Sequence, residues 1–321
     1  MVTIGSTRID TNIFLAPLSG CSDLAFRLIA REHGAKFCFF EMVDSNSIVY
    51  GGHRKSLSIL DTNGQDTPIA AQVLGEDPSS VLRAATTMLE RSKASFMDIN
   101  AACPVKKVIK KGAGAYLLKN SGTLCKIIKK LALALPIPVT VKIRSGFEVS
   151  DIKLITGIAK KCESSGASAI FIHGRSRAQG YAGEVDYKAI KAVKESVKIP
   201  VFGTGNIFSG ESAKRMFDET GCDGISVARG ALGNPWIFQE IESHLKSGAP
   251  SQPVPLETRK AVLKKHLSYV HRYRRSGSPG IIGFMRKIAL WYLKGFPNAA
   301  KMRHQISVVN DYEKMLELID S

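Results

Sequence analysis

A cysteine-bearing turn follows a short apolar run in the first third of the chain. The run Asp98-Ile99-Asn100 leads into Ala101-Ala102-Cys103-Pro104, which places Cys103 where an expected strand ends and a loop begins. A thiol with an ordinary pKa of about 8.5 is mostly protonated at neutral pH and can donate a proton. An isolated cysteine is more often a small buried hydrophobe. A catalytic interpretation therefore depends on what the rest of the chain places beside it.

Polar side chains also end other apolar runs. Gln72, Lys142 and His173 each stand at the end of a run that is otherwise apolar. One such residue could be a satisfied core group, but three that converge on one edge indicate a ligand site. An isoalloxazine ring needs hydrogen-bond donors at its carbonyl oxygens and N1. Gln72 and Lys142 can supply them, and Lys142 would stabilise negative charge on the reduced ring.

Two glycine-rich turns, Gly203–Asn206 and Ala228–Pro235, follow the last two runs. In barrels, turns at these places often hold a phosphate with main-chain N–H groups, and Arg229 would add a positive charge. The turns favour a phosphate-bearing cofactor or substrate, although glycines at barrel turns also serve plain geometry.

The hydrophobic periodicity predicts the scaffold that positions these residues. Between residues 13 and 228, eight short apolar runs alternate with stretches whose apolar residues recur every three or four positions. This alternation favours a parallel (β/α)8 TIM barrel, with a doubly wound sheet as the alternative. Every run delivers residues suited to chemistry to the same rim, as in a barrel, and a hairpin over residues 2–12 is expected to cap the opposite end. The expected strands are 13–16, 37–43, 69–73, 96–100, 139–143, 169–173, 201–204 and 224–228, and the expected helices are 23–33, 78–91, 124–133, 151–164, 187–195 and 210–219.

A small helical domain, residues 248–321, is expected after a barrel of residues 1–247. A linker rich in Pro, Gly and Ser at 247–255 precedes expected helices at 257–275, 281–294, 298–308 and 311–319. No acidic residue occurs between Thr258 and Asn310, and the basic residues there are interleaved with aromatic ones. A surface of one sign favours phosphate contacts over a merely solvated basic face. The basic residues of this stretch are Arg259, Lys260, Lys264, Lys265, Arg272, Arg274, Arg275, Arg286, Lys287, Lys294, Lys301 and Arg303.

The composition narrows the class of protein. Lys and Arg number 45 against 28 Asp and Glu, a net charge of +17, which favours a polyanionic partner over a merely basic surface. No apolar run approaches the ~18 residues of a membrane span, and no N-terminal segment resembles an export signal. The six cysteines form no CxxC pair, so neither zinc nor disulfides are expected. We expect a cytoplasmic protein that binds no metal and no membrane and has no obligate protein partner.

Five distinctive segments lie at the expected strand ends: APLSGCSD at 16–23, NAACP at 100–104, VKIRSGF at 141–147, HGRSRAQGY at 173–181 and ARGALGNPW at 228–236. A sixth, RKIALWYLKGFP at 286–297, lies in the expected helical domain. In combination they resemble the tRNA-dihydrouridine synthase family over nearly the whole chain. The resemblance implies a barrel that binds FMN and reduces the C5=C6 bond of particular uridines in tRNA with NADPH, while the helical domain holds the tRNA.

The resemblance also implies roles for individual residues. Hydride would pass from flavin N5 to uracil C6, and Cys103, in the family's general-acid position, would protonate C5. The family commonly has Gly where Ala102 stands and Asn where Thr204 stands; the second departure puts that side chain's contact with the flavin in question. The positions assigned to FMN are Ala16, Pro17, Leu18, Gln72, Lys142, His173, Thr204, Gly205, Asn206, Ala228 and Arg229. Those assigned to uracil or tRNA are Asn100, Arg144, Arg175, Arg177, Lys106, Lys107, Arg286 and Lys287, with the basic segment 105–120 expected to be a loop that faces RNA phosphates.

Two other functions fit part of the sequence. A flavoprotein barrel that reduces a small molecule, such as dihydroorotate or an enone, would keep the flavin residues but leave the basic tail unexplained. An RNA-binding protein without catalysis would explain the tail but not the presence of Cys103, Lys142 and His173 together.

Overall fold

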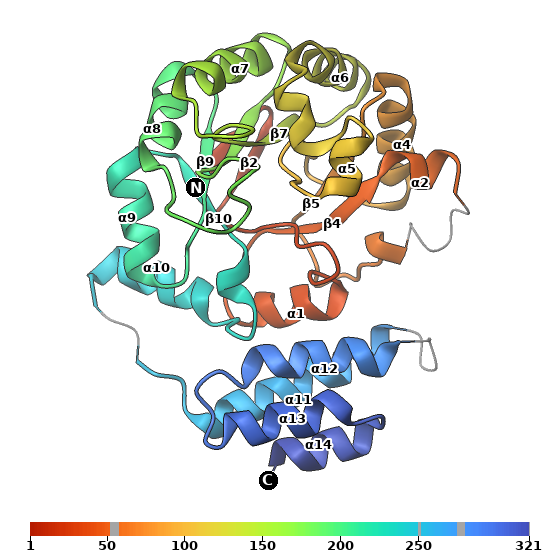
Figure 1. The fold of residues 1–321 in the computed structure, drawn as a ribbon, viewed down its shortest axis with the longest axis vertical. Helices are drawn as coiled ribbons and strands as arrows, with labels where there is room; N and C mark the ends of the chain where they lie inside the picture. Colours follow the sequence, from red (N-terminus) through yellow and green to blue (C-terminus); the bar gives the residue numbers. More distant parts are fainter. Residues whose placement is uncertain (52–57, 250–251, 275–279, 321) are drawn as a thin grey trace.

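Eight parallel strands alternate with helices and close into a barrel (Figure 1). The computed structural model describes residues 1–51, 58–249, 252–274 and 280–320. Neighbouring strands follow the order β3-β10-β9-β8-β7-β6-β5-β4, and the Leu15 N–H donates to the Phe37 carbonyl at 2.9 Å, which joins the first strand to the approach to the second. The expected TIM barrel is confirmed, and the doubly wound sheet was the wrong alternative. The strands are β3 (Ile13–Leu15), β4 (Cys38–Asp44), β5 (Ile69–Leu74), β6 (Met97–Asn100), β7 (Val139–Arg144), β8 (Ala169–His173), β9 (Val201–Thr204) and β10 (Gly224–Val227).

Six helices surround the barrel close to their predicted bounds. Each begins after a polar residue whose side chain accepts a main-chain N–H of the first turn, which satisfies one of the unpaired donors at a helix start. Each buries one apolar face, as the periodicity predicts. They are α1 (Leu24–Glu32), α4 (Pro78–Arg91), α6 (Ser121–Ala134), α7 (Ile152–Ser164), α8 (Tyr187–Ser196) and α9 (Gly210–Thr220).

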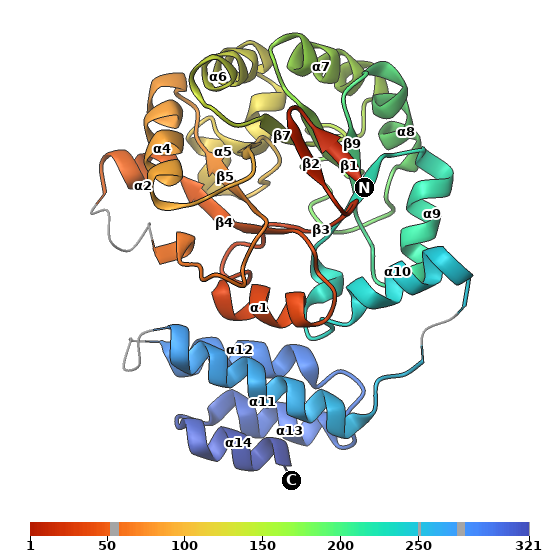
Figure 2. The same cartoon turned by 180° about the vertical axis from the view of Figure 1, so that it is seen from behind.

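An N-terminal hairpin closes one end of the barrel (Figure 2). Its strands, β1 (Val2–Ile4) and β2 (Thr7–Ile9), bury Val2, Ile4 and Ile9. These side chains share one apolar cluster with six phenylalanines of the barrel strands and their approaches: Phe14, Phe37, Phe39, Phe96, Phe171 and Phe202. The predicted cap is confirmed. Because this end is filled with packed rings, a ligand can enter only at the carboxyl ends of the strands.

The segment after the cysteine turn is not the expected loop. It contains the helix α5 (Lys106–Lys110) and the 3-10 helix η2 (Gly114–Leu118). Helix α5 has only five residues, no side-chain cap and no buried residue, so it leaves no apolar periodicity in the sequence. Sequence reasoning also missed α2 (Ser45–Val49), η1 (Ser58–Leu60), η3 (Arg229–Ala231) and α10 (Ile237–Ser247).

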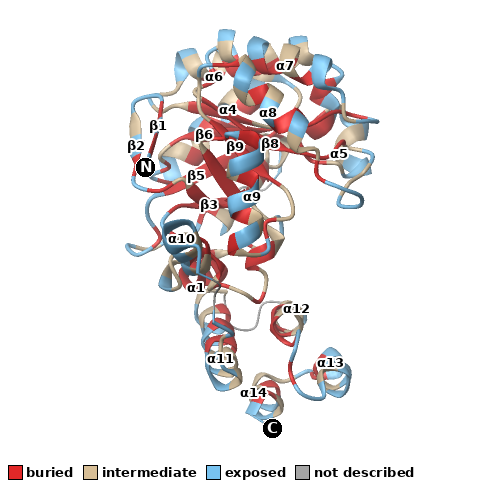
Figure 3. Ribbon diagram, turned by 90° about the vertical axis from the view of Figure 1, so that its left-hand side faces the viewer, coloured by how far each residue is buried: buried red, intermediate tan, exposed pale blue. Residues whose placement is uncertain are grey.

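Four C-terminal helices pack together beneath α1 (Figures 1 and 3). They bury a core of their own, to which α1 contributes Ala25 and Ile29. Two ion pairs cross the same contact: Arg274 with Asp23 at 3.1 Å, and Lys265 with Glu32 at 2.7 Å. The helices α11 (Leu256–Tyr273), α12 (Ile281–Tyr292), α13 (Ala299–Val308) and α14 (Tyr312–Asp320) confirm the predicted ones.

Two parts of the sequence prediction for this region fall outside the described residues: Arg275 and the linker positions 250–251. Among the helices that are described, none combines the length and apolar character needed to cross a membrane.

Candidate active site

A chain of hydrogen bonds runs up the inside of the barrel, from β6 and its neighbours to the open rim. Gln72 of β5 lies opposite Asp98 of β6, which in turn lies opposite Thr140 of β7. Asp98 accepts hydrogen bonds from Gln72 Nε2 at 2.6 Å through Oδ2 and from Thr140 Oγ1 at 2.6 Å through Oδ1. Gln72 Oε1 accepts from Asn100 Nδ2 at 2.8 Å. The predicted residues Gln72 and Asn100 are thus in direct contact.

The upper end of this chain holds the cysteine turn. Asn100 Oδ1 accepts the main-chain N–H groups of Ala102 at 3.0 Å and Cys103 at 2.9 Å. The Cys103 side chain is 9% exposed and packs against Leu74 and Ala113. Burial raises the pKa of the Cys103 thiol, so the thiol is protonated at neutral pH. The turn is formed with Ala102 in place, so its additional methyl group does not prevent this geometry.

Lys142 and His173 stand on the next two strands of the barrel, Lys142 near the carboxyl end of β7 and His173 at that of β8. Lys142 lies opposite Asn100, and its Nζ has no hydrogen-bond or ion-pair partner among the described residues. Burial lowers the pKa of Lys142 to about 8, against an opposing effect of Asp98. Burial also lowers the pKa of His173 to about 2, and the positive charges of Arg144 and Lys142 act in the same direction. At neutral pH, His173 is therefore uncharged and Lys142 mostly charged.

The two glycine-rich turns lie side by side at the ends of β9 and β10. Gly205 (φ 131°) and Asn206 (φ 51°) have left-handed backbone conformations, and Arg229 Nη2 lies 3.5 Å from Asn206 Oδ1. The main-chain N–H groups of Gly205, Asn206, Arg229 and Gly230 have no hydrogen-bond partner among the described residues. The turns therefore present several free donors and one guanidinium group at a single place, which suits an anion.

Thr204, the residue that departs from the family pattern, joins two strands. Its side chain is buried, and its Oγ1 donates to the Ser226 carbonyl at 2.8 Å. This bond turns the hydroxyl toward β10.

The first strand end, Ala16-Pro17-Leu18, belongs to the same rim. The Ala16 N–H donates to the Val227 carbonyl at 2.8 Å, so the segment lies next to the end of β10. Ala16 is buried, whereas Pro17 and Leu18 are half-buried. The eleven positions assigned to a flavin thus all lie at or next to the carboxyl ends of barrel strands.

Two of the predicted arginines are buried and connect loops of the rim through hydrogen bonds. Arg144 donates to the Ala102 carbonyl at 2.7 Å, the Gly180 carbonyl at 2.9 Å and the Ser176 carbonyl at 3.0 Å. Arg175 donates to the carbonyls of residues 182 and 183 and to Asn206 Oδ1. Both side chains are at least 98% buried, so most of their donors serve to hold the rim together. Arg177 is more open and lies over the Phe147 ring at 5.0 Å.

The predicted basic residues outside the rim fall into two groups. Lys106 and Lys107 are exposed on α5. Arg286 and Lys287 of α12 are half-buried and make contacts within the protein: Arg286 Nη1 donates to the Ser307 carbonyl at 2.7 Å, and Lys287 Nζ donates to the Gly20 carbonyl. Lys287 therefore connects α12 to the loop that follows β3.

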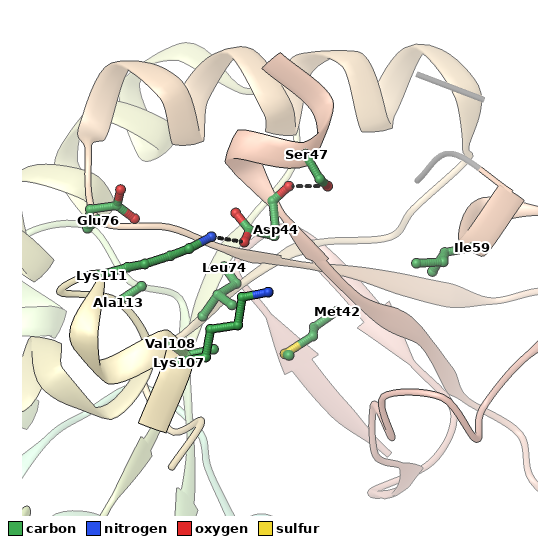
Figure 4. A pocket seen from close by; sticks show the side chains of 10 residues that line it. All are labelled: Met42, Asp44, Ser47, Ile59, Leu74, Glu76, Lys107, Val108, Lys111 and Ala113. Carbon is green, nitrogen blue, oxygen red and sulfur yellow. Dashed lines mark hydrogen bonds and ion pairs between the residues drawn. The ribbon is translucent and has the colours of Figure 1, made fainter. Parts of the chain in front are cut away.

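A cavity of about 310 Å³ adjoins the cysteine turn (Figure 4). Its apolar wall includes Leu74 and Ala113, the two residues that pack against Cys103. The lining also includes charged residues, and Lys111 Nζ lies 3.1 Å from Asp44 Oδ2. The other lining residues are Met42, Ser47, Ile59, Glu76, Lys107 and Val108.

Sequence reasoning missed Asp98 and Thr140 as members of the site. A signal was present, because residues i and i+2 of a strand point to the same side. Asp98 and Thr140 stand two residues before Asn100 and Lys142, and the same spacing identifies a second polar layer beneath the rim. Among the described residues, no group of three or more His, Cys, Asp or Glu side chains is arranged to hold a metal ion.

Comparison with known proteins gives a consistent result. Residues 14–321 match the family model described as dihydrouridine synthase (Dus). The tRNA-dihydrouridine synthase B of Pseudomonas aeruginosa is 35% identical over 311 residues, which cover 97% of this chain and 92% of that protein. A probable tRNA-dihydrouridine synthase of Rickettsia bellii is 35% identical over 312 residues, which cover 97% and 94%.

Among solved structures, the old yellow enzyme homologue from Zymomonas mobilis superposes with a TM-score of 0.55 over 80% of this chain and 94% of that one. The identity is 13%, so this likeness supports the barrel fold alone.

Proposed function

The chain belongs to the dihydrouridine synthase family, and from that premise we propose that it uses FMN and NADPH to reduce tRNA uridine, with Cys103 as the proton donor. The family assignment makes it a flavin-dependent oxidoreductase that acts on uridine in tRNA. The observation that carries the finer proposal is the position of Cys103 at the rim, where its main-chain N–H donates to Asn100, the residue opposite Lys142 in the sheet.

The residues at the rim fit a flavin mononucleotide. The free N–H groups of Gly205, Asn206 and Gly230, together with Arg229, suit its phosphate. Lys142, whose ammonium group has no partner in the described part of the chain, suits the electron-rich edge of the ring. Thr204 would contribute through its main chain, because its hydroxyl is bonded to the Ser226 carbonyl.

When bound, a flavin would supply hydride, which would add at C6 of the uracil because the C5=C6 bond is conjugated with the C4 carbonyl. The enolate that results needs a proton at C5. Cys103 can give it because burial keeps the thiol protonated at neutral pH. Arg144 and Arg175 donate to main-chain carbonyls, whereas Lys142, opposite Asn100 in the sheet, has no hydrogen-bond partner among the described residues. Lys142 would therefore supply the positive charge that stabilises the enolate.

We propose that residues 1–247 form the catalytic domain and residues 248–321 a tRNA-binding domain. A base in a folded RNA cannot be reached while stacked, so the enzyme must read the shape of the tRNA and turn one nucleotide into the rim. Exposed cations on both parts, such as Lys107 on α5 and Lys301 and Arg303 on α13, suit its phosphates. The cavity beside Cys103 offers room for part of a nucleotide. A cytoplasmic location follows from the substrate.

A direct assay tests the proposal. The purified protein should contain FMN and form dihydrouridine in an unmodified tRNA with NADPH faster than with NADH. Protein that cannot be loaded with FMN, or that reduces small enones but no tRNA, would overturn it. Mapping dihydrouridine in tRNA from cells with and without the protein identifies the modified position.

A further inference from the structure

We propose that Asp98 is a positioning residue that holds the Cys103 turn in place through Gln72 and Asn100. This inference deepens the proposed function, because its catalytic consequence rests on Cys103 as the proton donor. Asp98 lies two layers below the thiol, and its side chain is completely buried. It makes no direct hydrogen bond to the turn.

The hydrogen bonds of the chain all have the same polarity. The Cys103 N–H donates to Asn100 Oδ1, Asn100 Nδ2 donates to Gln72 Oε1, and Gln72 Nε2 donates to Asp98 Oδ2. Burial raises the pKa of Asp98 to about 6, against the opposing effect of the hydrogen bonds from Thr140 and Gln72, so the ionised form prevails at neutral pH. An ionised carboxylate can only accept, whereas each amide side chain can both donate and accept. Asp98 is therefore the end of the chain that determines its direction.

The effect of Asp98 is seen by considering the opposite orientation of the Gln72 side-chain amide. If its amide were turned round, Gln72 Oε1 would face Asp98 Oδ2 and Nε2 would face the Asn100 amino group, which sets acceptor against acceptor and donor against donor. Asn100 could relieve the second conflict only by turning as well, and would then withdraw Oδ1 from the N–H groups of Ala102 and Cys103. Asp98 thus keeps Asn100 hydrogen-bonded to the cysteine turn, although Asp98 itself does not contact the turn.

The location of Asp98 supports a role beyond packing. The layer below it consists of phenylalanine rings, including Phe96 on the same strand, and an apolar residue would continue that layer without desolvating a charge. A buried carboxylate destabilises the fold unless its hydrogen bonds offset the cost, and Asp98 has no ion-pair partner within 4.0 Å among the described residues. Its hydrogen bonds lead to Gln72 and Thr140, and the Gln72 branch ends at Cys103.

The test compares Asp98→Ala and Asp98→Asn with Ser226→Ala. Ser226 is buried on β10, and its Oγ has no hydrogen-bond partner in the described structure, so this variant controls for a change inside the barrel. The first measurement is the rate at which iodoacetamide alkylates Cys103, followed by mass spectrometry of its peptide, in protein with and without flavin. The second is kcat and KM for tRNA, together with flavin content.

Asp98→Ala should raise the alkylation rate several-fold and lower kcat by up to about 10²-fold, as expected for a displaced catalytic group. KM for tRNA should change little, and any loss of flavin should be partial, because Gln72 is one of eleven positions assigned to the flavin. Asp98→Asn keeps one acceptor without the charge and should give an intermediate result, which decides the question if the alanine variant does not fold. Ser226→Ala should behave as the unchanged protein.

Alkylation of Cys103 at the wild-type rate in the folded Asp98 variants would overturn the inference, even if activity fell. An equal increase in Ser226→Ala would also overturn it, because the effect would then be one of general packing. These outcomes are distinct from failure of the proposed function, which would show as unchanged dihydrouridine formation in Cys103→Ala.

Discussion

Replacing Cys103 with alanine should separate proton donation from the other properties of the protein. The side chain is small and contacts Leu74 and Ala113 in a minor cluster, while its main-chain N–H, which Asn100 holds, is retained in the variant. The turn should therefore keep its shape, and none of the eleven residues assigned to the flavin is altered.

The structure gives two magnitudes that differ enough to be told apart. Loss of one buried sulfur atom of this size should lower the free energy of unfolding by about 1 kcal/mol. Loss of a positioned general acid should slow the step that it serves by about 10²–10⁴-fold, which corresponds to about 3–5 kcal/mol of activation free energy. Lost stability cannot account for lost activity of that size in a protein that is still folded.

Rapid-mixing absorbance of the flavin resolves the two half-reactions. In Cys103→Ala, reduction by NADPH should be unchanged, and oxidation by tRNA should be slowed by the factor above. Cys125→Ala on α6 is the matched control, because Cys125 is a half-buried cysteine outside the rim. Equal rates of oxidation by tRNA in the two variants would refute the assignment, and slowing of both half-reactions in Cys103→Ala would mean that the flavin had been disturbed instead.

The same reasoning predicts a dependence on pH. The donor must be protonated, and burial raises the pKa of the Cys103 thiol above its ordinary value. Burial lowers the pKa of Lys142 to about 8, so loss of its positive charge should slow oxidation by tRNA near pH 8 in both proteins. A further decline at higher pH, which comes from deprotonation of the thiol, should be absent in Cys103→Ala.

Three further changes test the charges and the helices. Lys142→Met should lower the midpoint potential of the bound flavin by about 30–60 mV, or about 1.4–2.8 kcal/mol, because it removes a positive charge from the rim; an unchanged potential in a spectroelectrochemical titration would contradict this. Burial lowers the pKa of His266 to about 3, below its value in the unfolded chain, so the unfolded state binds more protons and stability falls as the pH drops from about 6.5 toward 3. Urea unfolding should show that the free energy of unfolding is lower at pH 4.5 than at pH 7 by up to about 3 kcal/mol. The difference should be smaller in His266→Leu/Tyr292→Phe, in which both members of the 3.1 Å hydrogen bond are replaced. An equal difference in the two proteins would mean that other groups cause it. Lys301→Glu/Arg303→Glu should weaken tRNA binding and reduce the slope of its salt dependence by about 0.7–0.9 for each phosphate that is no longer neutralised, whereas Lys188→Glu/Lys198→Glu, with the same change in net charge on the barrel, should have a smaller effect.

The barrel and its rim could be predicted because both leave local patterns in the sequence. Buried strands appear as short apolar runs, and a polar residue at the end of such a run, as at Gln72 or His173, stands out against them. The cap residues before the helices, such as Asp77 and Asp151, are equally local. These signals positioned most elements within one or two residues.

The remaining features depend on partners far apart in the chain. Arg286 and Lys287 appear in the sequence as part of a basic surface, but the Ser307 and Gly20 carbonyls that accept their hydrogen bonds are distant in sequence. Asp98 looks like an interruption of an apolar strand until Gln72 and Thr140 are seen on the neighbouring strands. Helix α5 was missed for another reason, since five exposed or half-buried residues carry no apolar pattern.

The positively charged side chains at the rim differ in whether they have hydrogen-bond partners within the protein. Arg144 and Arg175 donate hydrogen bonds to main-chain carbonyls and so hold the loops around the rim in place. Most of their N–H groups are therefore used within the protein, but their positive charges still act on the site. Those charges, together with burial, keep His173 neutral, and His173 cannot then supply positive charge to an enolate. Lys142 has no partner among the described residues and stands in register with Asn100, three residues before Cys103. Under the proposed function, Lys142 would stabilise the developing negative charge and Cys103 would deliver the proton, with Asp98 in the layer beneath Lys142 and Asn100.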